Sequence, residues 1–193
     1  MLEEAARRYG ARIDLRWHAY ELRPEPAPMP DPDSDYIQEH WQNRVLPMAD
    51  ERGLVMRVPR RGLRSRRALQ ASLFARRHGG FRELDRAIYR ARFEKDVDIS
   101  DLDVLKDLAR GAGIDADALA YAVKANAHLE DLNADLILAG QLGINGVPTA
   151  FIGPEADGLF AFFSAAEPVI GAVPFEWLGA AIDRALSRPE TSA

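Results

Sequence analysis

The apolar positions of the chain follow two different periods. Residues 3–10 and 63–142 show the spacing of amphipathic helices. Glycines separate the successive helices of the longer stretch: Gly79, Gly80, Gly111, Gly113 and Gly143. Residues 12–20 instead alternate between apolar and polar with period two, which predicts a strand with one buried face. The pattern therefore predicts a helix and a strand, followed at some distance by a small bundle of helices.

After Gly143 the apolar residues gather in short runs. Residues 149–152 and 159–163 predict the two strands of a hairpin, because a turn from Gly153 to Gly158 lies between them. Residues 174–186 predict a closing helix with a proline in its first turn. The expected element order is helix, strand, helical insertion, hairpin and final helix.

A connector rich in proline follows the first predicted strand. Prolines occupy every second position over residues 24–32, and residues without N–H donors cannot sustain a regular ladder. We therefore expect an extended surface loop there. Ser34 is the expected cap of a helix that runs to about Arg52, with a kink at Pro47 and an end at Gly53.

Two helices of the later bundle carry start signals. Ser100 and Asp103 resemble a capping box, in which two side chains satisfy backbone N–H groups at a helix start. Asp115 is the expected cap of the next helix.

The composition excludes several classes of protein. The chain has 193 residues, of which 47% are hydrophobic and 28% charged, which suffices for one core or two small ones. No apolar run approaches the roughly 18 to 20 residues of a membrane helix, and the charged start of the chain has no apolar signal core. We therefore expect a cytoplasmic protein with no membrane partner. The net charge of −5 disfavours a generally basic nucleic-acid binder.

Cysteine is absent, and this restricts the chemistry more than any other feature. A chain without thiols has no disulfide, no thiolate nucleophile and no cysteine-ligated metal. The four histidines show no metal-ligand spacing, and we interpret each as a surface or boundary residue: His18, His40, His78 and His128. Four aspartates resemble a calcium loop but lack its glycine and terminal glutamate: Asp96, Asp98, Asp101 and Asp103. The sequence thus offers no catalytic residue, no metal site and no cofactor.

Nine arginines lie between residues 57 and 82 with no acidic residue among them: Arg57, Arg60, Arg61, Arg64, Arg66, Arg67, Arg76, Arg77 and Arg82. Such a run suits phosphate groups and gives salt-dependent affinity for nucleic acid. The intervening aromatics, Phe74 and Phe81, have core spacing, and residues 83–107 are rich in acids that could pair with the run. We favour a solvated or ion-paired face over nucleic-acid binding.

Four segments resemble one known family. The turn from Gly143 to Ile152, with Gly146-Val147-Pro148-Thr149, resembles the cis-proline loop of thioredoxin-fold proteins. Residues 17–24 look like a strand and its exit in the DsbA-like family, specifically its FrnE-type cytoplasmic branch. Residues 68–113 are similar to that family's inserted helical domain, and residues 171–174 to the entry of its last helix.

The resemblance implies an α/β fold with a thioredoxin-like core and a helical insertion. The core would comprise residues 1–53 and 144–193, and the insertion residues 54–143. The family begins with a central strand and a Cys-x-x-Cys motif, whereas this sequence begins partway along the helix that follows them. The core is therefore expected to be N-terminally truncated, either through a misplaced gene start or in a degenerate relative. Because a missing central strand leaves backbone groups unpaired, strand pairing in a homodimer is a further expectation.

In the family, thiol–disulfide exchange begins with a thiolate that this chain lacks, so we expect a redox-inactive protein and leave open whether it is an enzyme. The resemblance implies that Gly146, Val147, Pro148 and Thr149 bind an extended peptide or a thiol-containing protein substrate by backbone pairing. Val147-Pro148 is expected to be cis.

Two alternatives remain. One is a relative of 2-hydroxychromene-2-carboxylate isomerases and kappa-class glutathione transferases. Their serine would fall in the missing segment, far from Ser34, Ser65, Ser72, Ser100 and Ser164. The other is a non-catalytic peptide-binding module.

Overall fold

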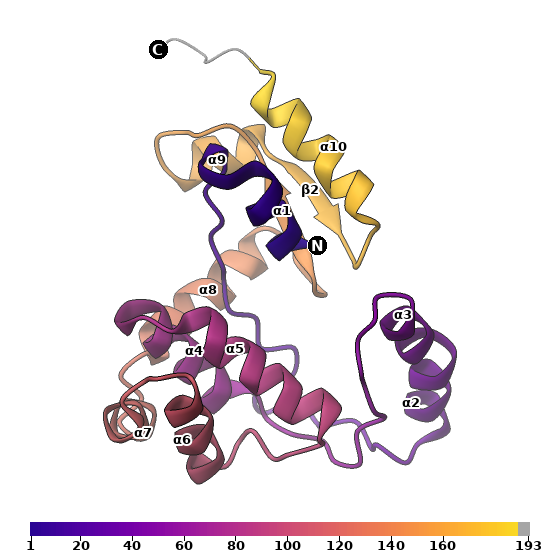
Figure 1. The fold of residues 1–193 in the computed structure, drawn as a ribbon, viewed down its shortest axis with the longest axis vertical. Coiled ribbons are helices and arrows are strands. Elements are labelled where there is room, and N and C mark those ends of the chain that lie inside the picture. The colour runs from indigo at the N-terminus through magenta and orange to yellow at the C-terminus, as the bar shows by residue number, and fades with distance from the viewer. Residues whose placement is uncertain (189–193) are drawn as a thin grey trace. The chain divides into compact units, whose positions relative to one another are not determined.

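A computed structural model describes residues 1–188 of the chain (Figure 1). Its contacts divide the chain into two compact units: Met1–His18 together with the chain from Ala139 onward, and Ala19–Leu138. The predicted domains placed their first boundary after residue 53, whereas residues 19–53 group here with the helical unit. None of the helices up to residue 188 is both long and apolar enough to span a membrane.

The first unit is built on a small antiparallel sheet of β1 (Thr149–Ile152) and β2 (Glu167–Ile170). Helices α1 (Leu2–Tyr9) and α10 (Phe175–Leu186) pack beside it, as predicted for both ends of the chain (Figure 1). Ile152 and Val169 meet a buried cluster drawn from these helices: Ala5, Tyr9, Leu178 and Ile182. Burial of such side chains is the main stabilising contribution, about 1.5–3 kcal/mol for each large one.

The opposite face of the sheet carries α9 (Leu159–Ala165), with the ring centroids of Phe151 and Phe163 5.0 Å apart. The prediction of a strand over 159–163 was therefore wrong. A continuous apolar run does not distinguish a buried strand from a short helix by its period. The place beside β1 that this run was expected to fill is taken by β2, which lies a few residues later.

Residues 12–20 were predicted to form a strand, and this was also wrong. Gly10–Arg12 form a 3-10 turn after α1, and Ile13 begins an extended segment at φ −128° and ψ 143°. The alternation of burial is as expected, since Ile13, Leu15 and Trp17 are half-buried. No strand of the described part of the chain forms a ladder with the segment, so the pattern gives an extended conformation without a sheet.

The second unit is helical, as predicted from the glycine-punctuated spacing. Its main helices are α4 (Arg66–His78), α5 (Phe81–Tyr89), α6 (Leu102–Gly111), α7 (Ala116–Lys124) and the greater part of α8 (Leu129–Gln141). Their apolar faces form one core around three fully buried leucines, Leu84, Leu105 and Leu119. A π-helical turn, η3 (Arg90–Glu94), extends α5.

The predicted helix over 34–52 is present but interrupted. It consists of α2 (Asp35–His40), the π-helical turn η2 (Trp41–Val45) and α3 (Leu46–Asp50). The interruption lies where Pro47 removes a helical N–H donor, and the Leu46 N–H reaches back to the Trp41 carbonyl instead. Gly53, at φ 64°, follows the end of the helix as expected.

One of the two predicted helix starts is confirmed. The Asp115 carboxylate accepts from the N–H groups of Asp117 and Ala118 and caps α7. At α6 the prediction of a Ser100–Asp103 box was wrong, because Asp101 is the cap and accepts from the Asp103 N–H at 2.8 Å. Ser100 instead donates to Asp98 at 2.6 Å in a local turn that precedes the helix.

Candidate functional site

The four predicted binding residues form a tight loop at the start of β1. The Thr149 hydroxyl donates to the Gly146 carbonyl at 2.9 Å and closes the loop with a side chain. The Gly171 N–H donates to the Pro148 carbonyl at 2.8 Å and fastens the loop to the end of β2. The peptide bond between Val147 and Pro148 is cis.

Val147 lies at the open part of this loop. Its side chain is 54% exposed, whereas its neighbours are held by the two bonds just described. Within residues 1–188, no hydrogen bond uses the backbone N–H or carbonyl of Val147. The loop therefore offers one donor and one acceptor to an extended chain that passes along it, as in strand addition.

The loop carries no group that can transfer a proton at neutral pH. No Asp, Glu, Lys, Arg or His occurs between Asp135 and Glu155 in the sequence. General acid–base catalysis needs a titratable side chain within hydrogen-bond reach of the reacting group. The residues of this loop can recognise a ligand through backbone groups and apolar contact.

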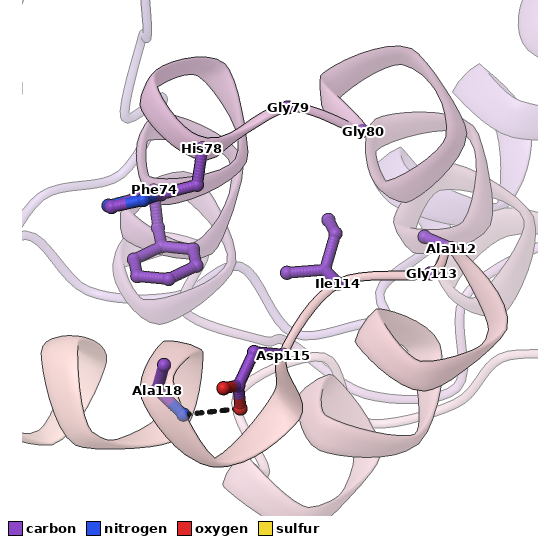
Figure 2. Close-up of a pocket in the computed structure, with 9 residues that line it drawn as sticks. All are labelled: Phe74, His78, Gly79, Gly80, Ala112, Gly113, Ile114, Asp115 and Ala118. Atoms are coloured by element: carbon purple, nitrogen blue, oxygen red, sulfur yellow. Dashed lines mark hydrogen bonds between the residues drawn. The ribbon is translucent and has the colours of Figure 1, made fainter.

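The second unit contains a separate pocket of about 500 Å³ (Figure 2). It lies where the turn between α4 and α5 meets the turn between α6 and α7, with the Ile114 side chain projecting toward its middle (Figure 2). His78 stacks on Phe74 with centroids 4.2 Å apart on one wall. The Asp115 carboxylate on another wall is occupied in capping α7. The pocket thus has apolar and backbone walls with one exposed imidazole.

Three comparisons place the chain among known proteins. Its fold matches the crystal structure of a probable DsbA oxidoreductase, SCO1869 from Streptomyces coelicolor, with a TM-score of 0.74. That match has 23% sequence identity and covers 99% of this chain and 84% of the other. The uncharacterized protein YwbO of Bacillus subtilis (strain 168) is 28% identical over 156 residues, which cover 78% of this chain and 76% of that protein.

A model of the DSBA-like thioredoxin domain matches residues 1–182. The chain belongs to this family. The predicted fold class, a thioredoxin-like α/β core with a helical insertion, is thereby confirmed. The sheet of the core is small, because β1 and β2 are its strands within the described residues.

Four of the five serines considered above donate local hydrogen bonds in this DSBA-like protein, and Ser65 lies at the start of α4 without a side-chain capping bond. Ser34 and Ser164 donate to the carbonyls of Asp31 and Phe160. Ser72 and Ser100 donate to the carboxylates of Asp85 and Asp98. A hydroxyl becomes a nucleophile when a base such as histidine accepts its proton in a position to act on a substrate. Two of these pairings lie in the turns that precede α2 and α6, one within α9 and one between α4 and α5, and none involves a histidine, which gives the serine-dependent alternative no support.

Three of the four histidines are exposed, as predicted, but the interpretation of His128 was wrong. His128 is only 6% exposed, and its Nδ1 lies 3.1 Å from the Asp131 carboxylate. Its ring meets Phe74 edge-on at a centroid distance of 6.0 Å. Asp131, in the first turn of the helix that begins directly after His128, allows this burial, which the spacing of histidines alone does not reveal. Among the described residues, no three acidic or histidine side chains gather to hold a metal.

Several arginines of the run are engaged in internal contacts. The Arg66 guanidinium donates two hydrogen bonds to one oxygen of the buried Glu21 carboxylate. Arg77 forms an ion pair with Asp131 at 2.6 Å. Arg64 and Arg67 donate to main-chain carbonyls at 2.7–3.0 Å. The acidic partners of Arg66 and Arg77 lie outside residues 83–107, where sequence reasoning placed them. Binding of these guanidinium groups to internal oxygens leaves fewer of them for phosphate.

The pocket in the helical unit was missed by sequence reasoning. Its rim contains Gly79, Gly80 and Gly113, which were interpreted only as helix ends. Two glycine turns that bound adjacent helices of a bundle are brought together when those helices pack. That signal was present in the sequence, but the pairing of the two turns depends on tertiary contacts.

Proposed function

We propose that this chain is a FrnE-type member of the DSBA-like family that binds extended segments of other proteins at Gly146–Thr149. The observation that carries the proposal is the unbonded backbone of Val147 in a closed, uncharged loop at the start of a strand. An extended chain can pair with such a loop whatever its sequence, because the contacts are made by backbone groups.

The proposal includes no thiol chemistry by the residues of this sequence. Thiol–disulfide exchange requires a thiolate that attacks a disulfide sulfur and forms a mixed disulfide. The sequence contains no cysteine, so neither the attacking nor the resolving sulfur can come from it. The structurally similar protein from Streptomyces coelicolor is a probable DsbA oxidoreductase, which supports a link to disulfide chemistry at the level of the family.

Peptide binding is tested with an insulin B chain whose thiols are blocked and which carries fluorescein. We expect a rise in anisotropy with a dissociation constant of about 1 µM to 1 mM, as for a short stretch of added strand. Val147→Pro removes the N–H donor and should weaken binding at least about tenfold, since one lost hydrogen bond costs about 0.5–1.5 kcal/mol and the ring adds a clash. Val147→Ala keeps the donor and serves as the control. Equal affinities for the two variants would contradict the proposal.

Redox inactivity is tested with insulin and dithiothreitol, whose turbidity reports disulfide reduction. The protein should accelerate the reaction no more than buffer does. Intact mass and a thiol count on untagged protein from its native source are measured in parallel. A mass of 21.4 kDa without thiols supports the proposal, whereas a larger mass with two thiols would restore disulfide exchange as the activity.

A further inference from the structure

The pocket in the helical unit contains a carboxylate oxygen that the chain itself does not use. The Asp115 carboxylate caps α7 through Oδ1 alone, which accepts from the N–H groups of Asp117 and Ala118 at 3.0 Å. Its other oxygen, Oδ2, accepts no hydrogen bond from residues 1–188 and lies on the side of the carboxylate toward Phe74 (Figure 2). One oxygen of this group is therefore structural, and the other is available to a ligand.

The charge of Asp115 is not balanced by a basic side chain. Three acidic residues on α6, α7 and α8 form ion pairs: Asp107 with Arg110, Asp117 with Lys106, and Asp131 with Arg77. Asp115 forms none within the described part of the chain, and no lysine or arginine of that part lines the pocket. Two helices end and two begin at the pocket, so their dipoles oppose one another. The pocket therefore attracts a positive charge toward Asp115.

The other walls of the pocket are mostly apolar. Phe74 is buried, Ile114 is half-buried, and Ala118 borders the same space on α7 (Figure 2). The volume of about 500 Å³ lies within the range of about 300–1,000 Å³ that is typical of small-molecule sites. These walls favour a cation that carries an apolar body. An inorganic cation such as calcium needs several oxygen ligands, which one carboxylate oxygen does not supply.

The free oxygen also discriminates between kinds of organic cation. A guanidinium group is planar and pairs best with both oxygens of a carboxylate at once. Oδ1 of Asp115 is already held by two N–H groups of α7, so this two-oxygen geometry is not available. An ammonium group is compact and can donate a single hydrogen bond to Oδ2.

We propose that this pocket binds a small primary amine with an apolar body. The ammonium group donates to Oδ2 of Asp115, and the apolar body lies against Phe74 and Ile114. All the lining residues fall between Phe74 and Ala118 in the helical unit, so the site is distinct from the loop at Gly146–Thr149. The inference does not depend on peptide binding by that loop.

The proposal is tested with benzylammonium, a primary ammonium group on an aromatic body that is charged at about pH 7. Titration into nitrogen-15-labelled protein, followed by NMR, gives the affinity and the site together. We expect a dissociation constant of about 1–10 mM, as for a ligand of this size, with shifts at the amides of residues 78–81 and 114–118. Benzyl alcohol and benzoate lack the positive charge and should bind at least about fivefold more weakly. Benzoate binding as tight as that of benzylammonium, or no shift at these amides up to about 20 mM, would refute the proposal.

Asp115→Asn separates the charge from the helix cap. Asparagine caps a helix as well as aspartate does, so α7 keeps its start while Oδ2 is replaced by an uncharged NH₂ group. The affinity for benzylammonium should fall at least about fivefold, with helical circular dichroism unchanged. Asp101→Asn is the matched control, because Asp101 caps α6 and does not line the pocket. Equal affinities for the two variants would overturn the proposal.

Ala118→Leu tests the place of the apolar body. A leucine at this position fills part of the pocket without changing its charge, and the affinity for benzylammonium should fall at least about threefold. Ala125→Leu is the control, since Ala125 is exposed, follows the end of α7 and does not line the pocket. An affinity unchanged by Ala118→Leu would place the amine outside the pocket and contradict the proposal.

Discussion

Arg92 and Asp96 form an ion pair of 2.8 Å in which both side chains are about nine-tenths buried. Both side chains also form hydrogen bonds with the backbone of residues 60–61, which precede α4. The Arg92 guanidinium donates to the Arg61 carbonyl at 2.9 Å, and the Asp96 carboxylate accepts from the Arg60 N–H at 3.3 Å. The two side chains therefore link η3 and the residues just after it to residues 60–61 through two hydrogen bonds, and the ion pair joins the two side chains to each other.

Arg92→Ala should lower the free energy of unfolding by about 3–5 kcal/mol, because it leaves the buried Asp96 carboxylate without its counter-ion. Urea unfolding followed by circular dichroism measures the change. Arg90→Ala is the control, since Arg90 and Glu94 form a pair with the same spacing on the exposed side of η3. The control should cost less than about 1 kcal/mol. Equal losses in the two variants would show that burial does not determine the effect.

Asp85 links stability to pH. Burial raises the pKa of Asp85, and the hydrogen bond from Ser72 only partly offsets this effect. A carboxyl whose pKa is higher in the folded state binds its proton more tightly there, so stability falls as pH rises through that pKa. Asp85→Asn removes this dependence. As the pH rises above about 4, wild type should therefore lose stability relative to Asp85→Asn. The difference in unfolding free energy between the two should become constant once Asp85 is ionised in the folded state.

Urea unfolding at intervals between pH 3 and 7 tests this expectation. Ser72→Ala is a useful companion, because loss of the donor should raise the pKa of Asp85 further and widen the pH range of the change. A difference between wild type and Asp85→Asn that is independent of pH would contradict the assignment.

Tyr9 joins the two terminal helices of the first unit. Its hydroxyl donates to the Gly179 carbonyl at 3.1 Å inside the cluster between α1 and α10. Tyr9→Phe keeps the ring and removes this donor, and the melting temperature should fall by about 2–4 °C. Tyr121→Phe, at a ring that is 78% exposed, should leave it unchanged. Calorimetry of both variants measures the two melting temperatures, and an unchanged value for Tyr9→Phe would show that the Tyr9 hydroxyl does not stabilise the fold.

Gly80 and Gly113 both have a left-handed backbone but differ in surroundings. A Cβ on Gly80 at φ +75° would lie 2.9 Å from Ile114, whereas a Cβ on Gly113 at φ +73° would meet no atom within 4 Å. Each alanine variant should lose about 1–2 kcal/mol from the backbone conformation. Gly80→Ala should lose more, because Ile114 must shift in the pocket. Similar losses would mean that the pocket accommodates a methyl group freely.

The helices were the most predictable part of the fold. In 66–141 the apolar residues recur at helical spacing and glycines mark the ends, so local sequence and tertiary packing agree. Asp115 was recognised as a cap because its side chain acts within three residues of its own position. Features that depend on residues close in the sequence could therefore be predicted from the sequence alone.

The strands and the site were less predictable because their partners are distant. Residues 12–20 have the alternation of a strand but no ladder among the residues described, and 159–163 could become helix because β2 pairs with β1 instead. Burial of His128 depends on Phe74 in another helix. The open backbone of Val147 follows from bonds that Thr149 and Gly171 make around it, which spacing does not reveal.

The division of the chain has a consequence for its synthesis on the ribosome. All of Ala19–Leu138 is one continuous stretch, whereas the other unit joins the first residues to the last. The helical unit can complete its contacts while translation is still in progress. The apolar face of α1 stays uncovered until α10 has been synthesised, since Tyr9 and Gly179 are 170 residues apart. At about 5–20 residues per second that delay is about 10–30 seconds, during which α1 is a natural target for chaperones.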